Sequence, residues 1–171
     1  MQKPLPDPAT PIGSPPSAGC IPSAGSTPSA GMEATPPTPA EVLALMLEKD
    51  SFSKWLGIRV DAIGPGYCKL HYHINDQMLN GFHQVHGGVL FSAADSALAF
   101  ACNSHGIISV ALDVSITFTR PARNGELLVV EAQELHLGNK TGLYEIRTTN
   151  AAGELVALFK GTAYRTGKPI A

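Results

Sequence analysis

The chain has 171 residues, enough for one domain of ordinary size, and its 12 basic and 14 acidic residues give a net charge of -2. That charge argues against nucleic acid as a partner, since nucleic-acid-binding domains usually carry a basic surface. No apolar run approaches the roughly 20 residues of a membrane span, and the three cysteines lack CxxC spacing. We therefore expect a reduced, cytoplasmic protein that binds neither nucleic acid nor membrane.

The first 37 residues differ in composition from the rest of the chain. They are mainly proline, alanine, serine and glycine, and Pro-Ser-Ala-Gly occurs at 16–19, 22–25 and 28–31. A segment with so few large apolar residues cannot bury a core. We predict a disordered tail over residues 1–37 and one folded domain over residues 38–167.

Order is predicted to begin at Thr38-Pro39-Ala40-Glu41, which has the N-cap, the first-turn proline and the returning glutamate of a capping box. The helix should end near Lys49, and a short helical turn is expected around residues 52–56. A hairpin over residues 58–74 should turn at Gly64-Pro65-Gly66. Apolar and polar residues alternate in its second half, which is typical of a half-buried strand.

The segment from Gly88 to Ser104 is apolar on nearly every side, which predicts a buried helix. Only strand patterns follow it. The first strand alternates over residues 110–119, with one apolar face: Val110, Leu112, Val114, Ile116 and Phe118. Three further strands are expected near 126–137, 142–149 and 154–165. This order predicts an α+β domain, a five- or six-stranded antiparallel sheet curled around one long helix, with a partner subunit as the second cover.

The long predicted helix and the segments on either side of it contain a single charged residue. Between Asp76 and Asp113 the chain carries only Asp95, when histidines are counted as neutral. A lone carboxylate on a buried helix has a desolvation cost and usually has a partner or a function. The helix also starts after His86-Gly87 with little side-chain bulk, so its first N–H groups can face developing negative charge. This combination suits attack on a carbonyl.

Several neighbouring residues have two interpretations. His86 can be a catalytic base, but we favour a role in which its ring N–H orients the loop and the helix start. His83 and His86 lack a third ligand at a sensible spacing, so no metal is expected. Asn80 can form a turn or bind the substrate. Asp113, the rival acid, should face solvent, and Cys102 should be a small core residue.

Six short sequence segments are more specific as a combination than any one of them is alone. They are Met78-Leu79-Asn80-Gly81, His86-Gly87-Gly88, Leu90-Phe91-Ser92-Ala93-Ala94-Asp95, Phe100-Ala101-Cys102-Asn103-Ser104, Gly138-Asn139-Lys140-Thr141-Gly142 and Val156-Ala157-Leu158-Phe159-Lys160-Gly161. Together they resemble the hotdog-fold acyl-CoA thioesterases, most closely the phenylacetate-degradation branch, over about residues 39–166. The resemblance implies a hotdog fold for this domain.

The resemblance also implies roles for single residues. The Gly87 N–H would serve as the oxyanion donor, Asn80 would help to bind the thioester oxygen or water, and Asp95 would attack directly or activate water. Each site would use two subunits of a catalytic dimer, and dimers would often pair into tetramers. Some relatives have a serine on the strand after the helix, and Ala111 stands at the matching position, so its assistance should be absent here.

The predicted function is hydrolysis of an acyl-CoA ester without a cofactor. By resemblance, phenylacetyl-CoA or a hydroxylated version is the leading substrate. Lys140, Arg120 and Arg123 are candidates to bind the CoA phosphates. The other residues expected to contact the substrate are Gly88 and an apolar wall of Phe82, Val85, Val89 and Leu90. The alternatives are a hotdog dehydratase or hydratase, and a non-catalytic acyl-CoA-binding module that would not need Asp95.

Overall fold

The protein is described by a computed structural model over residues 35–170, so most of the predicted tail lies outside the described residues. Two helices come first, α1 (Pro39–Lys49) and α2 (Ser51–Leu56). The capping box is confirmed: the Glu41 N–H donates to Thr38 Oγ1 at 3.3 Å, and the Thr38 N–H donates to Glu41 Oε2 at 2.8 Å. Gly57 ends α2 with a left-handed φ of 71°, which glycine adopts without strain.

Six strands form one antiparallel sheet in the order β1-β2-β4-β5-β6-β3. A short 3-10 helix, η1 (Asp76–Met78), and the long helix α3 (Gly87–Asn103) separate β2 from β3. The last strand continues beyond its predicted end near residue 165. The strand bounds are β1 (Arg59–Gly64), β2 (Tyr67–His73), β3 (Ile107–Phe118), β4 (Leu127–Leu137), β5 (Thr141–Asn150) and β6 (Leu155–Pro169).

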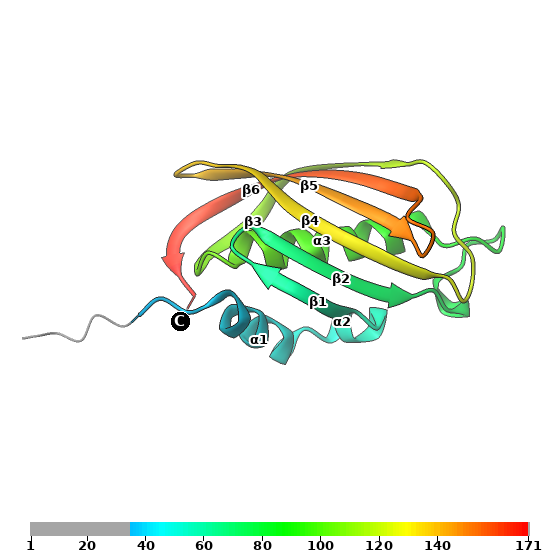
Figure 1. Ribbon diagram of the computed structural model, residues 1–171, viewed down its shortest axis with the longest axis horizontal. Coiled ribbons are helices and arrows are strands. Elements are labelled where there is room, and N and C mark those ends of the chain that lie inside the picture. Colours follow the sequence, from blue (N-terminus) through cyan, green and yellow to red (C-terminus); the bar gives the residue numbers. More distant parts are fainter. Residues whose placement is uncertain (1–34, 171) are drawn as a thin grey trace, which may run out of the picture. The chain divides into compact units, whose positions relative to one another are not determined.

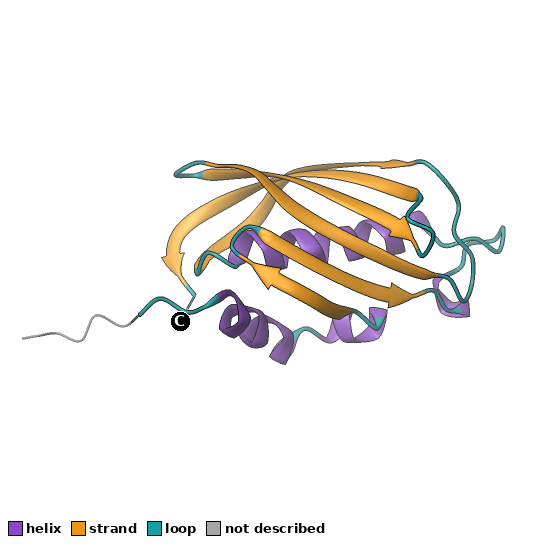
Figure 2. Cartoon of the chain, viewed as in Figure 1, coloured by secondary structure: helices purple, strands orange, loops and turns teal. Residues whose placement is uncertain are grey.

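The sheet curls around α3, while α1 and α2 lie beside β1 (Figures 1 and 2). This is the predicted α+β hotdog architecture, a curled antiparallel sheet around one long helix. The helix is buried along most of its length, as its apolar composition predicted. Its chemistry can therefore reach solvent only at the ends and along the strip that the sheet leaves uncovered.

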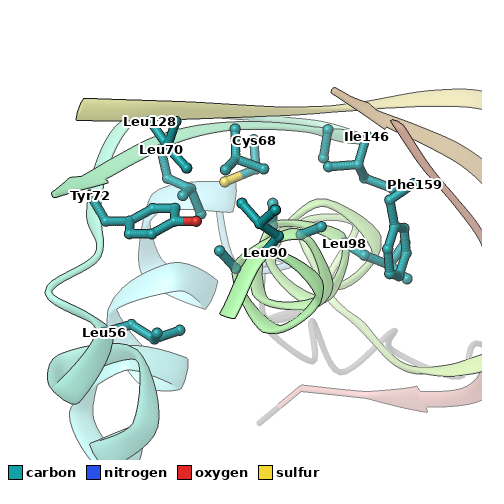
Figure 3. Close-up of a cluster of buried hydrophobic side chains, with 14 of the residues drawn as sticks. Leu56, Cys68, Leu70, Tyr72, Leu90, Leu98, Leu128, Ile146 and Phe159 are labelled. Carbon is teal, nitrogen blue, oxygen red and sulfur yellow. The ribbon is translucent and has the colours of Figure 1, made fainter. Parts of the chain in front are cut away.

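Apolar side chains from the sheet meet α3 in the core, where Leu90 and Leu98 face Leu70, Ile146 and Phe159 (Figure 3). Gly161 on β6 makes a close approach possible, because a Cβ there would lie 2.6 Å from Leu98 Cδ2. Cys102 is a buried core residue, as predicted, and burial raises the pKa of its thiol to about 12.

The predicted alternation of β3 is wrong in its first half. Ala111 pairs with Ala163 and Asp113 pairs with Thr162, so Leu112 is an extra residue in a β-bulge. The bulge changes which residues face the sheet interior, and Val110 and Leu112 are 52% and 62% exposed. After the bulge the expected pattern holds, and Asp113 is exposed as predicted. Ala111 lies directly before the bulge and is itself exposed.

Candidate active site

The start of α3 is built by the loop before it. The His86 N–H donates to the Met78 carbonyl at 2.8 Å, which closes the loop over residues 79–85. His86 then caps the helix, because its Nδ1 accepts the Gly88 N–H at 2.9 Å. His86 thus caps the helix start with a ring nitrogen that accepts a hydrogen bond, and the predicted donation by a ring N–H is not the contact formed there. The Gly88 N–H is therefore occupied by this cap.

The neighbouring Gly87 N–H donates no hydrogen bond within residues 35–170. Gly87 lies on a cavity of about 350 Å³, whose wall includes Gln84, Leu90, Phe118 and Arg120. A Cβ at residue 87 would lie 3.0 Å from the Phe118 ring, so a larger residue would narrow this cavity. A free N–H at the positive end of a helix is suited to stabilise an oxyanion.

The position of Asn80 is compatible with both of its predicted roles, forming a turn and binding the substrate. Its Oδ1 accepts the Phe82 N–H at 2.8 Å and the Gln84 N–H at 3.3 Å, which makes it the organiser of the loop. Its Nδ2 donates no hydrogen bond within the described part of the chain. The side chain is partly buried, so this amide remains available as a donor beside the start of α3.

Asp95 lies on a second cavity, of about 270 Å³, between α3, β3 and α1. Its carboxylate makes no hydrogen bond or ion pair with residues 35–170. Burial raises the pKa of this carboxyl above its usual value, because the charged form loses water. A carboxylate that is partly desolvated and unpaired is a stronger base than an exposed one.

Hydrogen bonds hold the walls of the Asp95 cavity in place. The Asn103 side chain donates to the Ser109 carbonyl and accepts the Ser109 N–H, both at 2.9 Å, so it joins the end of α3 to β3. Ala111 lines the same cavity. Its methyl group cannot bind water, and the wall beside Asp95 is apolar there.

Gly87 and Asp95 are eight positions apart on α3, about 12 Å along the axis at 1.5 Å per residue. They line different cavities of one subunit. An oxyanion donor and an attacking group must both approach one carbonyl within about 3 Å. One subunit therefore does not bring these two groups to the same carbonyl.

The other predicted substrate residues do not gather at one place. Phe82 is 85% exposed on the loop and Val89 is buried in the core, so of the four residues expected to form an apolar wall, Val85 and Leu90 are those that line the Gly87 cavity in one subunit. Lys140 lies in the exposed turn between β4 and β5 and lines neither cavity. Arg120 is the basic residue on the Gly87 cavity, where it pairs with Glu154.

Sequence reasoning missed two cavity residues, Phe118 beside Gly87 and Met46 beside Asp95. The alternation over residues 110–119 places Phe118 on a strand face without linking it to the helix start, and the sequence gives Met46 only an apolar helical spacing. Within residues 35–170 no three His, Cys, Asp or Glu side chains are grouped as a metal site would require. No helix in this part of the chain is long and apolar enough to span a membrane.

Comparison with known proteins shows the family of this chain. The family model of the thioesterase superfamily matches residues 82–157, which include the Gly87 amide and Asp95. The chain is 42% identical to the acyl-coenzyme A thioesterase PaaI of Escherichia coli over 125 residues, which are 73% of this chain and 89% of that protein. The chain belongs to the thioesterase superfamily.

Similar solved structures support the same assignment. The Escherichia coli PaaI protein from the phenylacetic acid degradation operon matches with a TM-score of 0.76 and 40% identity over 78% of this chain and 96% of that one. A mutant of the phenylacetic acid degradation protein PaaI from Thermus thermophilus matches with a TM-score of 0.66 and 34% identity, over 68% and 99%. A Streptococcus mutans protein bound to acetyl CoA has a TM-score of 0.64 and 25% identity, over 66% and 91%.

These likenesses confirm the predicted enzyme class, a thioester hydrolase, and the predicted hotdog thioesterase fold. They also confirm the resemblance to the phenylacetate-degradation branch on which the sequence interpretation rested. The superfamily match begins at Phe82, so α1 and α2 lie outside it.

Proposed function

We propose that this thioesterase hydrolyses an arylacetyl-CoA, such as phenylacetyl-CoA or hydroxyphenylacetyl-CoA, to the free acid and CoA. The observation that carries the proposal is the pair of groups on α3: a free Gly87 N–H at the helix start and the unpaired Asp95 carboxylate. The PaaI likenesses support the acyl class, and the Streptococcus mutans structure supports CoA as the carrier. No cofactor is part of the proposal.

In the proposed reaction the Gly87 N–H and the Asn80 amide polarise the thioester carbonyl. Asp95 either removes a proton from water as the water oxygen attacks, or attacks the carbonyl itself and forms an anhydride that water then opens. The oxyanion formed collapses, the C–S bond breaks, and the CoA thiolate takes up a proton. The raised pKa of Asp95 favours the proton-accepting step.

The proposed site requires a homodimer, in which Gly87 of one subunit meets Asp95 of the other. The twelve residues of β3 offer an edge for it, since β3 pairs only with β6 among the described strands. Its exposed Val110 and Leu112 would be covered by such a partner. Two dimers would then pair into a tetramer, for which the exposed Leu143 and Tyr164 on the outer sheet face provide apolar surface.

A cytoplasmic location is proposed on the cysteines. Cys68 and Cys102 are both free and buried, which is the usual state of cysteine in a reducing compartment. Fractionation of cells that express the full chain would test this directly.

The activity is tested by measuring free thiol released by the full chain from acetyl-, hexanoyl-, phenylacetyl- and hydroxyphenylacetyl-CoA. We expect the highest kcat/KM for the two arylacetyl esters. Hydration of crotonyl-CoA without thiol release would instead show the hydratase, although His86, the histidine such an enzyme would use, is engaged in the helix cap. Binding of the esters without turnover would show a non-catalytic module.

A further inference from the structure

The two cavities along α3 differ in chemistry. The Gly87 cavity includes the side chains of Gln84, Thr119 and Arg120, whereas apolar side chains dominate the wall of the Asp95 cavity. The polar side chain of Asn103 in that wall is already bonded to β3. A CoA ester has the same asymmetry, with phosphates on one side of its carbonyl and the acyl group on the other. Phosphates need basic and polar partners, and acyl groups favour apolar pockets.

One wall of the Asp95 cavity comes from a different part of the chain than the rest. The lining residues belong to α3 and β3 except Met46, which lies on α1 and packs partly buried against the core. Ala99 follows Asp95 by one helical turn, so the two share a face of α3. The space next to the Asp95 carboxylate is therefore bounded by the long, flexible side chain of Met46 on α1 and by the methyl group of Ala99 on α3.

The position of α1 relative to Asp95 is fixed by contacts. Val42 on α1 is buried in the domain. At the junction of α1 and α2, Asp50 accepts the Ser53 N–H at 2.9 Å and the Ser53 hydroxyl at 2.5 Å. The same Ser53 hydroxyl lies 3.4 Å from the hydroxyl of Ser96, the residue after Asp95. Met46 thus lies on α1, directly before the helix α2 that contacts α3 at the residue next to Asp95.

We propose that the acyl group enters the cavity beside Asp95 and that Met46 sets the size limit of that group. This inference rests on the proposed acyl-CoA thioesterase activity. A cavity of about 150 Å³ in a protein core can hold benzene, so the cavity of about 270 Å³ has room for one aromatic ring and a short acyl arm. Met46 is then a specificity-determining residue contributed by a helix outside the superfamily match.

The test compares kcat/KM for acetyl-, phenylacetyl- and naphthylacetyl-CoA in the full-length wild type and variants. Met46→Ala should raise the naphthylacetyl to phenylacetyl ratio about tenfold, because a truncated wall admits the second ring. Ala99→Leu should lower the phenylacetyl to acetyl ratio about tenfold, because it fills the same space. Leu45→Ala is the matched control, since Leu45 is on α1 but is 45% exposed and lines a different groove.

The outcomes separate the two proposals. If the wild type hydrolyses phenylacetyl-CoA while Met46→Ala changes the ratio no more than Leu45→Ala does, this inference is overturned and the proposed function stands. If the wild type releases thiol from none of the esters, the proposed function fails and the inference fails with it. Thermal unfolding checks that each variant folds. Met46→Val, a smaller truncation with the same expected direction, replaces Met46→Ala if that variant is unfolded.

Discussion

Asp95 occupies a place that is unfavourable for its charge. It is partly buried, it has no hydrogen-bond partner within residues 35–170, and burial raises its pKa. An acid whose folded pKa lies above its unfolded pKa destabilises the native state once it ionises. Proteins usually keep such a group where it reacts, because stability alone would select against it.

Replacement of Asp95 by Asn should separate activity from stability. We expect kcat to fall at least about a hundredfold, since a positioned base or nucleophile is lost. As pH rises through the raised pKa, the unfolded state gives up its proton before the folded state does, so wild-type stability declines over that window. Asp95→Asn removes this decline and should exceed the wild type in Tm at neutral pH, with a smaller difference at acidic pH.

The control for this comparison is Asp113→Asn, because Asp113 is an exposed acid on β3. It should retain wild-type turnover, and because it keeps Asp95 its stability should decline with rising pH as that of the wild type does. Wild-type turnover in Asp95→Asn would remove Asp95 from the mechanism. A Tm below that of the wild type at neutral pH would show that its charge does not oppose folding.

At the scale of elements, the sequence predicted what depends on local chemistry. The capping box at Thr38 and Glu41 located the start of α1, and the apolar run after Gly88 located α3 within one residue at each end. The bulge at Leu112 was missed because it is set by the pairing of β3 with β6, which is distant in the chain. Met46 was missed for the same reason, since α1 reaches the Asp95 cavity only in the folded domain.

The contact between α3 and β6 predicts a stability effect at Gly161. Gly161→Ala should lower the free energy of unfolding by about 1–3 kcal/mol, because its Cβ would overlap Leu98 Cδ2 and overpacking has costs of this size. Urea unfolding measures the change. Gly64→Ala is the control, since no atom lies within 4 Å of a Cβ there and the change should be small. Equal stabilities for the two variants would mean that α3 can move away from β6 freely.

At the scale of the whole molecule, the uncovered side of the domain is its most distinctive feature. The free edge of β3, its exposed apolar residues and both cavities of α3 are on residues that a second subunit could cover. If Gly87 of one subunit and Asp95 of the other form one active site, Asn80 of that site should come from the same subunit as Gly87. Both residues belong to the loop and start of one helix.

Asn80→Ala and Asp95→Asn should therefore complement each other. Each variant alone alters both sites of its homodimer. In a mixed dimer, one site contains both substitutions and the other site contains neither. Random reassortment makes about half of the dimers mixed, so unfolding and refolding the two variants together should restore roughly a quarter of wild-type activity. The measurement is thiol release after refolding, with the dimer fraction determined by sedimentation.

A double variant gives the opposite result in the same experiment. When Asn80→Ala/Asp95→Asn is refolded with an equal amount of wild type, every mixed dimer has one lesion in each site, so activity should fall to about a quarter rather than half. No recovery in well-folded mixed dimers of the single variants would place both residues in a one-subunit site.

The strand order has a consequence for synthesis of the chain. β1, β2, β4 and β5 are neighbours in the sheet, but β3 joins them only through β6 among the described strands. Of the described strands, β6 is synthesised last. β3 and the adjoining strip of α3 therefore leave the ribosome before the strand that pairs with β3 has been made. The sheet therefore closes only after β6 has been synthesised. A product truncated before Leu155 displays an open apolar strand, the kind of surface that chaperones and proteases act on.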